Sequence, residues 1–221
     1  MEQPIQIGWR RGDPLDSLLS SEWLVTNALG GYASGTIGGA CTRRFHGQLI
    51  AALPAPAGRL MMLNHIEETI ALPDGHCLRL SGDEQGGERA IAFPEPDLLE
   101  EFGGLPVWRF SRAGLRVEKR LFMPHEQNTT YIIYKLLGGP PGLALNVRPS
   151  LHFRPHEGLL NTEVPPDWSV VGDGRDLEIR GGEKFPALRL ALLGRDVTCV
   201  PRTIARRSVR FYRSSSASSG L

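Results

Sequence analysis

The chain has 221 residues, a hydrophobic fraction of 41% and a formal net charge of +1. This length suits one large domain or two small ones, and the apolar fraction is sufficient for a buried core. The 25 basic residues are dispersed along the sequence, whereas a nucleic-acid partner requires a clustered basic face, so we expect no nucleic-acid partner.

The spacing of the cysteines and the lack of long apolar runs predict where in the cell the protein lies. Cys41, Cys77 and Cys199 are widely spaced and form no CxxC pair, which is typical of free thiols in a reducing cytosol. The segment 9–11 is basic but has no apolar run behind it, so we expect no signal peptide. No stretch approaches the ~18 apolar residues of a membrane span. These features predict a cytoplasmic protein with no membrane partner.

The first distinctive stretch runs from Glu22 to Leu53. Residues 23–25 predict the end of a short strand, and five glycines between Asn27 and Gly39 predict a loop with tight turns or close backbone approach. Thirteen residues are many for a connector, so we expect other groups to hold the loop in place. The glycine spacing is that of a P-loop, but no lysine and no helix follow, which argues against nucleotide binding.

A cationic group follows this loop at once. If residues 43–46 form a strand, Arg44 and His46 point to one side and Arg43 to the other. We therefore expect Arg43 to hold the loop by bonding its carbonyls, while Arg44 and His46 face solvent or a partner.

Two roles remain open for this group. Arg, His and Asn side chains are suited to bind sugar hydroxyls, and Tyr32 or Trp23 can stack on a pyranose ring. Alternatively, both arginines are structural and bond backbone groups or the carboxylates of Glu67 and Glu68. The sequence pattern alone does not choose between these roles.

The rest of the chain alternates between short strands and turns. Apolar residues recur with period 2 in the ranges 59–72, 76–80, 105–110, 115–123, 143–154, 177–180 and 187–193. The range 130–137 is apolar on both faces, which predicts a central strand. Only 13–21 and 97–102 indicate one or two helical turns. In the strand at 115–123, Val117 and Leu121 share one face, and Glu118 lies on the opposite, polar face.

These strands, separated by 17 prolines and 26 glycines, predict an all-β fold, a large antiparallel β-sandwich. We expect a single domain over residues 1–213, either complete or lacking strands at its C-terminal end. Residues 202–213 carry five arginines among apolar residues. The serine-rich tail 214–221 is predicted to be disordered.

A second polar cluster comprises Arg148, His152, Arg154 and His156. The H-x-x-x-H spacing suits zinc on a helix, but this stretch predicts a strand interrupted by Pro155, and no clear third ligand lies nearby. We therefore expect no metal and no cofactor.

Three segments of the first stretch carry a family resemblance. The segments EWLVTN (22–27), LGGYASGT (29–36) and TRRFHG (42–47) resemble the signature of the N-terminal domain of bacterial and archaeal glycogen debranching enzymes, the amylo-α-1,6-glucosidases. Ala28 stands where that family commonly has glycine, and Phe45 where it commonly has tyrosine. The resemblance extends more loosely through 59–72 and 148–156.

The resemblance implies a super-β-sandwich of the kind that precedes α/α-toroid glycosidase domains. It implies two partners, a C-terminal catalytic domain that is absent from this chain and glycogen or another branched α-glucan. The residues that it and the polar patterns assign to the substrate or the domain interface are Asn27, Tyr32, Arg43, Arg44, His46, Arg148, Arg154 and His156. The alternative function is a stand-alone carbohydrate-binding β-sandwich without hydrolytic activity.

Hydrolysis by this chain alone is not expected. Glycosidases hold two carboxylates about 5–10 Å apart across the scissile bond. The doublets at 67–68 and 100–101 lie in strands, where adjacent side chains face opposite ways, and no G-x-S-x-G motif occurs. The resemblance places the catalytic acids in the missing domain.

Overall fold

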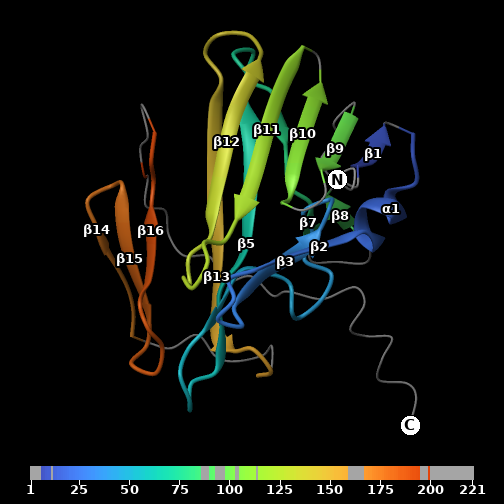
Figure 1. Ribbon diagram of the computed structural model, residues 1–221. Helices are drawn as coiled ribbons and strands as arrows, with labels where there is room; N and C mark the ends of the chain where they lie inside the picture. Colours follow the sequence, from blue (N-terminus) through green and yellow to red (C-terminus); the bar gives the residue numbers. More distant parts are fainter. Residues whose placement is uncertain are drawn as a thin grey trace.

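The computed structural model describes residues 6–10, 12–85, 90–92, 98–102, 105–112, 114–158, 167–194 and 199. Within these ranges the chain forms sixteen strands and one short helix, α1 (Leu15–Ser20) (Figure 1). The strands are β1 (Gln6–Arg10), β2 (Glu22–Thr26), β3 (Tyr32–Thr36), β4 (Gly47–Ala52), β5 (Arg59–Ala71), β6 (Cys77–Arg79), β7 (Asp83–Gln85), β8 (Ala90–Ala92), β9 (Leu98–Phe102), β10 (Val107–Arg112), β11 (Leu115–Phe122), β12 (Tyr131–Gly138), β13 (Ala144–Pro155), β14 (Trp168–Gly172), β15 (Asp176–Gly181) and β16 (Leu188–Ala191).

Two large antiparallel sheets form the body of the domain. The first sheet has the order β1-β9-β10-β11-β12, and the second has the order β13-β5-β4-β3-β2, with β6 also paired to β5. A three-stranded sheet, β14-β15-β16, stands beside them at the left of Figure 1, and β7 and β8 form a small ribbon. The antiparallel all-β prediction is confirmed.

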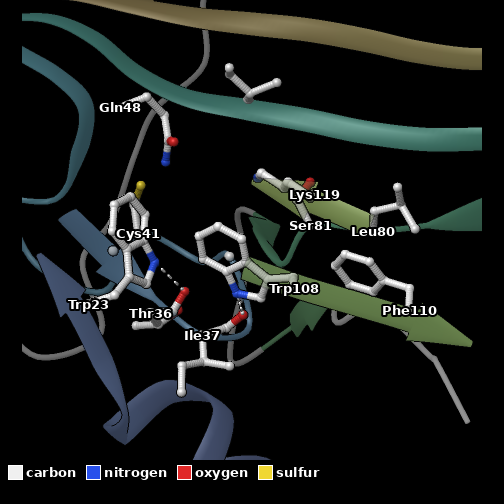
Figure 2. Close-up of a pocket in the computed structure, with 13 residues that line it drawn as sticks. Trp23, Thr36, Ile37, Cys41, Gln48, Leu80, Ser81, Trp108, Phe110 and Lys119 are labelled. Carbon is white, nitrogen blue, oxygen red and sulfur yellow. Dashed lines mark hydrogen bonds between the residues drawn. The ribbon is translucent and has the colours of Figure 1, made fainter. Parts of the chain in front are cut away.

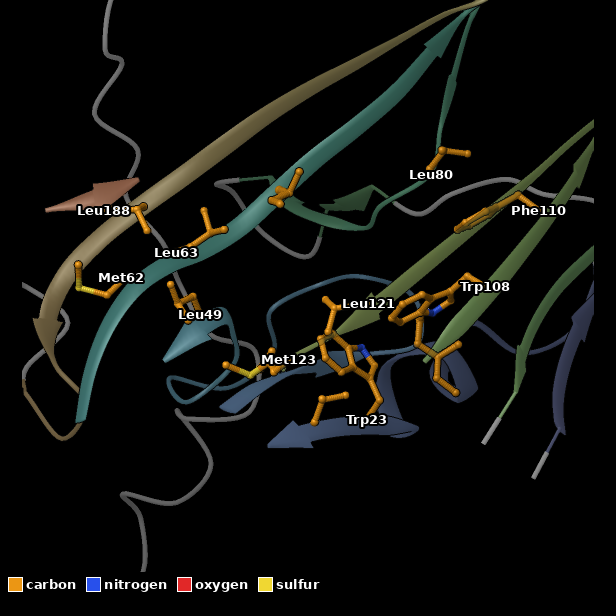
Figure 3. Packing of buried hydrophobic residues seen from close by; sticks show 14 of the residues in the cluster. Trp23, Leu49, Met62, Leu63, Leu80, Trp108, Phe110, Leu121, Met123 and Leu188 are labelled. Atoms are coloured by element: carbon orange, nitrogen blue, oxygen red, sulfur yellow. The ribbon is translucent and has the colours of Figure 1, made fainter. Parts of the chain in front are cut away.

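The two large sheets pack face to face. Trp23 of β2 and Trp108 of β10 meet edge to face, with ring centroids 5.4 Å apart. Leu121 from the first sheet and Leu49 and Leu63 from the second are buried in the same apolar cluster (Figure 3). Alternation along each strand sends these side chains inward, so their burial drives the association of the sheets.

A buried ion pair links the sheets within this apolar layer. Glu68 of β5 is fully buried, and Nζ of Lys119 on β11 lies 2.7 Å from its Oε1. Tyr134 of β12 donates its hydroxyl to the same carboxylate. Burial, the charge of Glu68 and this hydrogen bond raise the pKa of Tyr134 well above its usual value. Because an unpaired buried charge is strongly unfavourable, these contacts hold the sheets in one register.

Local turn chemistry places several elements where the sequence predicts them. The Pro73–Gly75 turn joins β5 to β6, and the N–H of Gly75 donates to the carbonyl of Leu72 at 3.0 Å. Gly114 precedes β11, and the residues of β10 and β11 pair in register. The short helix α1 lies within the predicted helical range 13–21.

Other predictions are wrong. The apolar segment at 130–137 forms β12, which is an edge strand rather than a central one. The range 98–102 is strand β9 and not a helical turn, because it pairs with both β1 and β10. Glu118 does lie on the face opposite Val117 and Leu121, as expected, and it is buried there with Arg109 and Arg120 both bonded to its carboxylate. The predictions for 202–213 and 214–221 fall outside the described residues.

The glycine-rich stretch is also not a continuous loop. Its centre forms β3, which pairs with β2 in a hairpin. Gly31 is required by close packing, since a Cβ there would lie 2.7 Å from Nδ2 of Asn27 and 2.9 Å from the carbonyl oxygen of Ile50. Such crowding explains the glycine without a ligand.

Candidate functional site

Tyr32 and His156 meet at one end of the second sheet although 124 positions separate them in sequence. Tyr32 begins β3, and His156 follows β13 directly. The Tyr32 hydroxyl lies 2.6 Å from Nε2 of His156 and 3.1 Å from the carbonyl oxygen of Phe45. The N–H of His156 donates to the carbonyl of Arg59 at 2.8 Å. The sheet therefore assembles a polar pair from two segments that the sequence had singled out separately.

An aromatic and cationic stack covers this pair. The ring of Phe45 lies on the ring of His156, with centroids 4.7 Å apart, and the guanidinium carbon of Arg44 lies 4.5 Å from the Phe45 centroid. Phe45 keeps 37% of its surface exposed. We call the residues Tyr32, Arg44, Phe45, Arg154 and His156 the rim cluster.

Arg154 holds the rim cluster together. It is fully buried, and its guanidinium donates to the carbonyls of Pro155 at 3.2 Å and His156 at 2.8 Å, and to the carbonyl of Arg44. These bonds join the turn at 43–46 to the end of β13. The sequence pattern predicts that Arg43 binds loop carbonyls, but in the structure Arg154 donates to the carbonyl of Arg44.

The electrostatics of the rim cluster keep its two polar rings neutral. Burial lowers the pKa of His156, and the nearby guanidinium groups of Arg59 and Arg154 lower it further. Burial raises the pKa of Tyr32, although Arg59 and Arg154 oppose that shift. At neutral pH the rim cluster thus offers a neutral imidazole, a neutral phenol and a cationic Arg44. This combination supplies hydrogen-bond donors and acceptors suited to sugar hydroxyls.

Arg43 and His46 correct the strand prediction for 43–46. These residues form a turn, so alternation does not apply to them. Arg43 is exposed, and its Nε lies 2.5 Å from Oε1 of Glu22. His46 is buried, and its Nδ1 accepts the N–H of Thr42 at 3.2 Å. Burial lowers the pKa of His46 to about 4, despite Glu22 nearby. His46 therefore faces the interior rather than a partner.

Asn27 is a structural hub rather than an exposed contact. It is buried, and its Oδ1 accepts the N–H groups of Leu29 at 3.0 Å and Gly31 at 2.9 Å. Its Nδ2 donates to the carbonyl of Gln127 at 2.9 Å and to Oδ1 of Asn128 at 3.0 Å. The side chain thus ties the β2–β3 turn to residues one hundred positions later.

Arg148 lies apart from the rim cluster. It sits in the first half of β13, opposite Glu67 of β5, and bonds the Glu67 carboxylate. Nη1 of Arg79 lies 3.4 Å from the same carboxylate. Arg43 and Arg44 therefore do not bind Glu67 or Glu68, because other cations occupy both carboxylates. The backbone form of that alternative holds for Arg44, whose Nη2 donates to the carbonyl of Glu157 at 3.5 Å.

Sequence reasoning missed Phe45 and Arg59 as members of this region. Phe45 had a signal, since it is an aromatic residue between Arg44 and His46 within the family motif. Arg59 had none; its Nε donates to the carbonyl of Gly30 at 2.7 Å, a contact that depends on tertiary folding.

A small cavity lies between the sheets and away from the rim cluster (Figure 2). Its volume is about 10 Å³, roughly the space of one water molecule. Trp23 and Trp108 line it, and their indole N–H groups donate to the carbonyls of Thr36 and Ile37, each at 3.1 Å. The cavity is far too small for a sugar.

Two further searches concern metals and membranes. In the part of the chain that the structure describes, no group of three or more His, Cys, Asp or Glu side chains is arranged to hold a metal ion. Within the same residues, no helix has the length and apolar character needed to span a membrane.

Comparison with known proteins identifies the family. No curated protein and no solved structure gave a significant match to the chain. A family model described as the glycogen debranching enzyme N terminal matches residues 21–213, which is nearly the whole chain. The match includes the β2–β3 hairpin and every residue of the rim cluster. The chain therefore belongs to the family of glycogen debranching enzyme N-terminal domains.

Proposed function

We propose that this domain packs on the catalytic portion of a glycogen debranching enzyme and places the rim cluster against the branched α-glucan. Family membership implies association with the rest of such an enzyme. The observation that supports a glucan contact is the exposed ring of Phe45, set between Arg44 and His156 and bordered by the Tyr32 hydroxyl.

The chemistry of the rim cluster fits a neutral polyhydroxyl ligand. The exposed edge of the Phe45 ring can contact the C–H groups of a pyranose, and adjacent donors and acceptors can bind the hydroxyls. Arg154 keeps the carbonyls of both supporting segments satisfied, so the exposed side chains stand on a fixed backbone. Preorganisation of this kind reduces the entropy lost on binding.

The test measures glucose release from a branched limit dextrin by a debranching enzyme that contains this domain. Phe45→Ala and Arg44→Ala should each raise KM for the dextrin by about tenfold, as loss of an exposed aromatic or cationic contact typically does. Turnover of a small aryl α-glucoside should stay unchanged, because such a substrate does not reach the rim cluster.

Arg148→Ala is the matched control, because Arg148 is an exposed arginine of the same domain outside the rim cluster. It should change neither the KM for dextrin nor the turnover of the aryl α-glucoside. If all three variants keep the dextrin KM and the melting temperature of the unmodified enzyme, the rim cluster makes no contact with glucan.

A further inference from the structure

Tyr32 lies between two groups that compete for its single hydroxyl proton. The phenol oxygen lies 3.1 Å from the carbonyl oxygen of Phe45 and 2.6 Å from Nε2 of His156. The carbonyl can only accept a hydrogen bond, whereas a neutral imidazole has one nitrogen that donates and one that accepts. The directions of these two hydrogen bonds therefore decide which nitrogen of His156 carries the proton.

Only one arrangement places a proton in both contacts. In it, Tyr32 donates to the Phe45 carbonyl, and Nε2–H of His156 donates to the phenol oxygen. If the phenol donated to Nε2 instead, the phenol and carbonyl oxygens would face each other at 3.1 Å without a proton between them. The Ser34 hydroxyl also donates to the Phe45 carbonyl, at 3.3 Å, and a carbonyl with two lone pairs accepts both donors. The hydrogen bonds thus specify the Nε2–H tautomer.

The other nitrogen of His156 is then an acceptor that faces solvent. Burial lowers the pKa of His156, and the guanidinium groups of Arg59 and Arg154 lower it further. Glu157 opposes these effects and Arg44 adds to them, so the ring is neutral at neutral pH and Nδ1 keeps its lone pair. In the part of the chain that the structure describes, Nδ1 has no hydrogen-bond partner and is not a buried atom.

Such an acceptor is scarce among the side chains of the rim cluster. The guanidinium groups of Arg44 and Arg154 only donate, and Phe45 has no polar group. The Tyr32 proton is directed to a carbonyl, and its oxygen already accepts a hydrogen bond. A sugar hydroxyl both donates and accepts, so its donor needs an acceptor on the protein. Nδ1 of His156 supplies that acceptor beside the donors of Arg44.

We propose that Tyr32 is a positioning residue, which holds His156 in the Nε2–H tautomer so that Nδ1 accepts a hydrogen bond from a glucan hydroxyl. The inference rests on the proposed function and names the atom that the ligand contacts. The two rings meet edge to face, with centroids 5.7 Å apart and an interplanar angle of 87°. The backbone N–H of His156 donates to the carbonyl of Arg59 at 2.8 Å. These contacts hold the ring and its backbone and leave Nδ1 directed to solvent.

Nitrogen-15 NMR of the 221-residue chain at about pH 8, where histidines are neutral, tests the tautomer directly. His156 should show a protonated Nε2 and an unprotonated Nδ1. Tyr32→Phe should shift both signals towards the mixture of tautomers that the exposed His76 shows, because the bond that sets the tautomer is lost. Tyr131→Phe is the matched control, since Tyr131 is an exposed tyrosine of β12 outside the rim cluster. It should leave the His156 signals unchanged.

Two substitutions of His156 test the ligand contact through the KM for branched limit dextrin, in a debranching enzyme that contains this domain. His156→Asn keeps an amide oxygen where Nδ1 lies, whereas His156→Gln keeps an amide N–H near Nε2 and has no acceptor at Nδ1. His156→Gln and Tyr32→Phe should each raise KM about threefold to tenfold, as loss of one neutral hydrogen bond does. His156→Asn should raise it less than about twofold.

Three results would overturn the inference: a protonated Nδ1 in the unmodified chain, unchanged His156 signals in Tyr32→Phe, and equal KM values for the two His156 variants. Melting curves confirm that each variant is folded. If Phe45→Ala raises KM while Tyr32→Phe changes neither KM nor the signals, the glucan contact stands and the positioning role fails. If Tyr32→Phe shifts the signals but no rim variant changes KM, the tautomer assignment stands and the glucan contact fails, together with the role of Nδ1 in it.

Discussion

Asn27 and three residues of the rim cluster, Tyr32, Arg44 and Phe45, come from the same sequence motif but use their side chains differently. Asn27 is buried, and its side chain makes two hydrogen bonds within its own turn and two to Gln127 and Asn128. Phe45 and Arg44 stack outward over His156. A conspicuous motif therefore contains both anchors, which complete the fold, and presented side chains, which are available to a ligand.

Arg154 and Arg44 give the sharpest test of this division, since they are the same residue type in contact with each other. Arg154→Ala removes the donor from three carbonyls in a buried setting and should lower the free energy of unfolding by about 3 kcal/mol or more. Arg44→Ala should cost about 1 kcal/mol or less, because its group is at the surface. Urea denaturation followed by fluorescence measures both, and similar losses would erase the distinction.

The pH dependence of the stability tests whether His46 is a buried, neutral anchor of the fold. Its pKa is about 4 in the fold and about 6.5 in the unfolded chain. The unfolded state therefore binds the proton more readily, and stability is full above pH 6.5 and declines as pH falls towards 4. Between pH 6.5 and 5 the loss from this residue is about 1.5 kcal/mol.

His46→Asn should remove that part of the pH dependence, because the amide oxygen can accept the Thr42 N–H and does not titrate. His152, whose pKa burial also lowers to about 4, should still contribute its own slope. Unfolding curves at pH 6.5, 6 and 5 give the comparison. An unchanged slope in the variant would mean that His46 is charged in the folded domain.

Ala28 offers the smallest expected effect. It follows Asn27 in the β2–β3 turn with φ of 64°, in the left-handed region that disfavours a Cβ. Ala28→Gly should therefore stabilise the domain by about 0.5–1 kcal/mol, the strain relieved being partly offset by the greater freedom of glycine in the unfolded chain. A lower melting temperature would contradict this account of the turn.

The sequence predicted the positions of strands better than it predicted which strands lie next to each other in a sheet. The hairpin of β10 and β11 follows from alternation and a glycine turn, which are local properties. The segment that became β12 was wrongly assigned to the centre of a sheet, because its apolar residues lie on both faces. It is an edge strand.

For the candidate site, the sequence named Tyr32, Arg44, Arg154 and His156, and the structure brings these together. It did not separate them from Asn27, His46 and Arg148, which lie elsewhere or face inward. Residue type and motif membership are the same for both groups. Burial and hydrogen-bond partners distinguish the two groups, and neither can be predicted from the local spacing of residues.

The sequence by itself determined the β class, the strand positions in most of the described chain and the family, because period-2 alternation and a motif are readable within short windows. Only the tertiary structure decided that Arg154, rather than Arg43, binds the turn at 43–46, across 110 positions. It also decided that β12 and β13 end their sheets on one flank. The physical reason is that alternation specifies which face of a strand is apolar, whereas the identity of the neighbouring strand depends on long-range pairing.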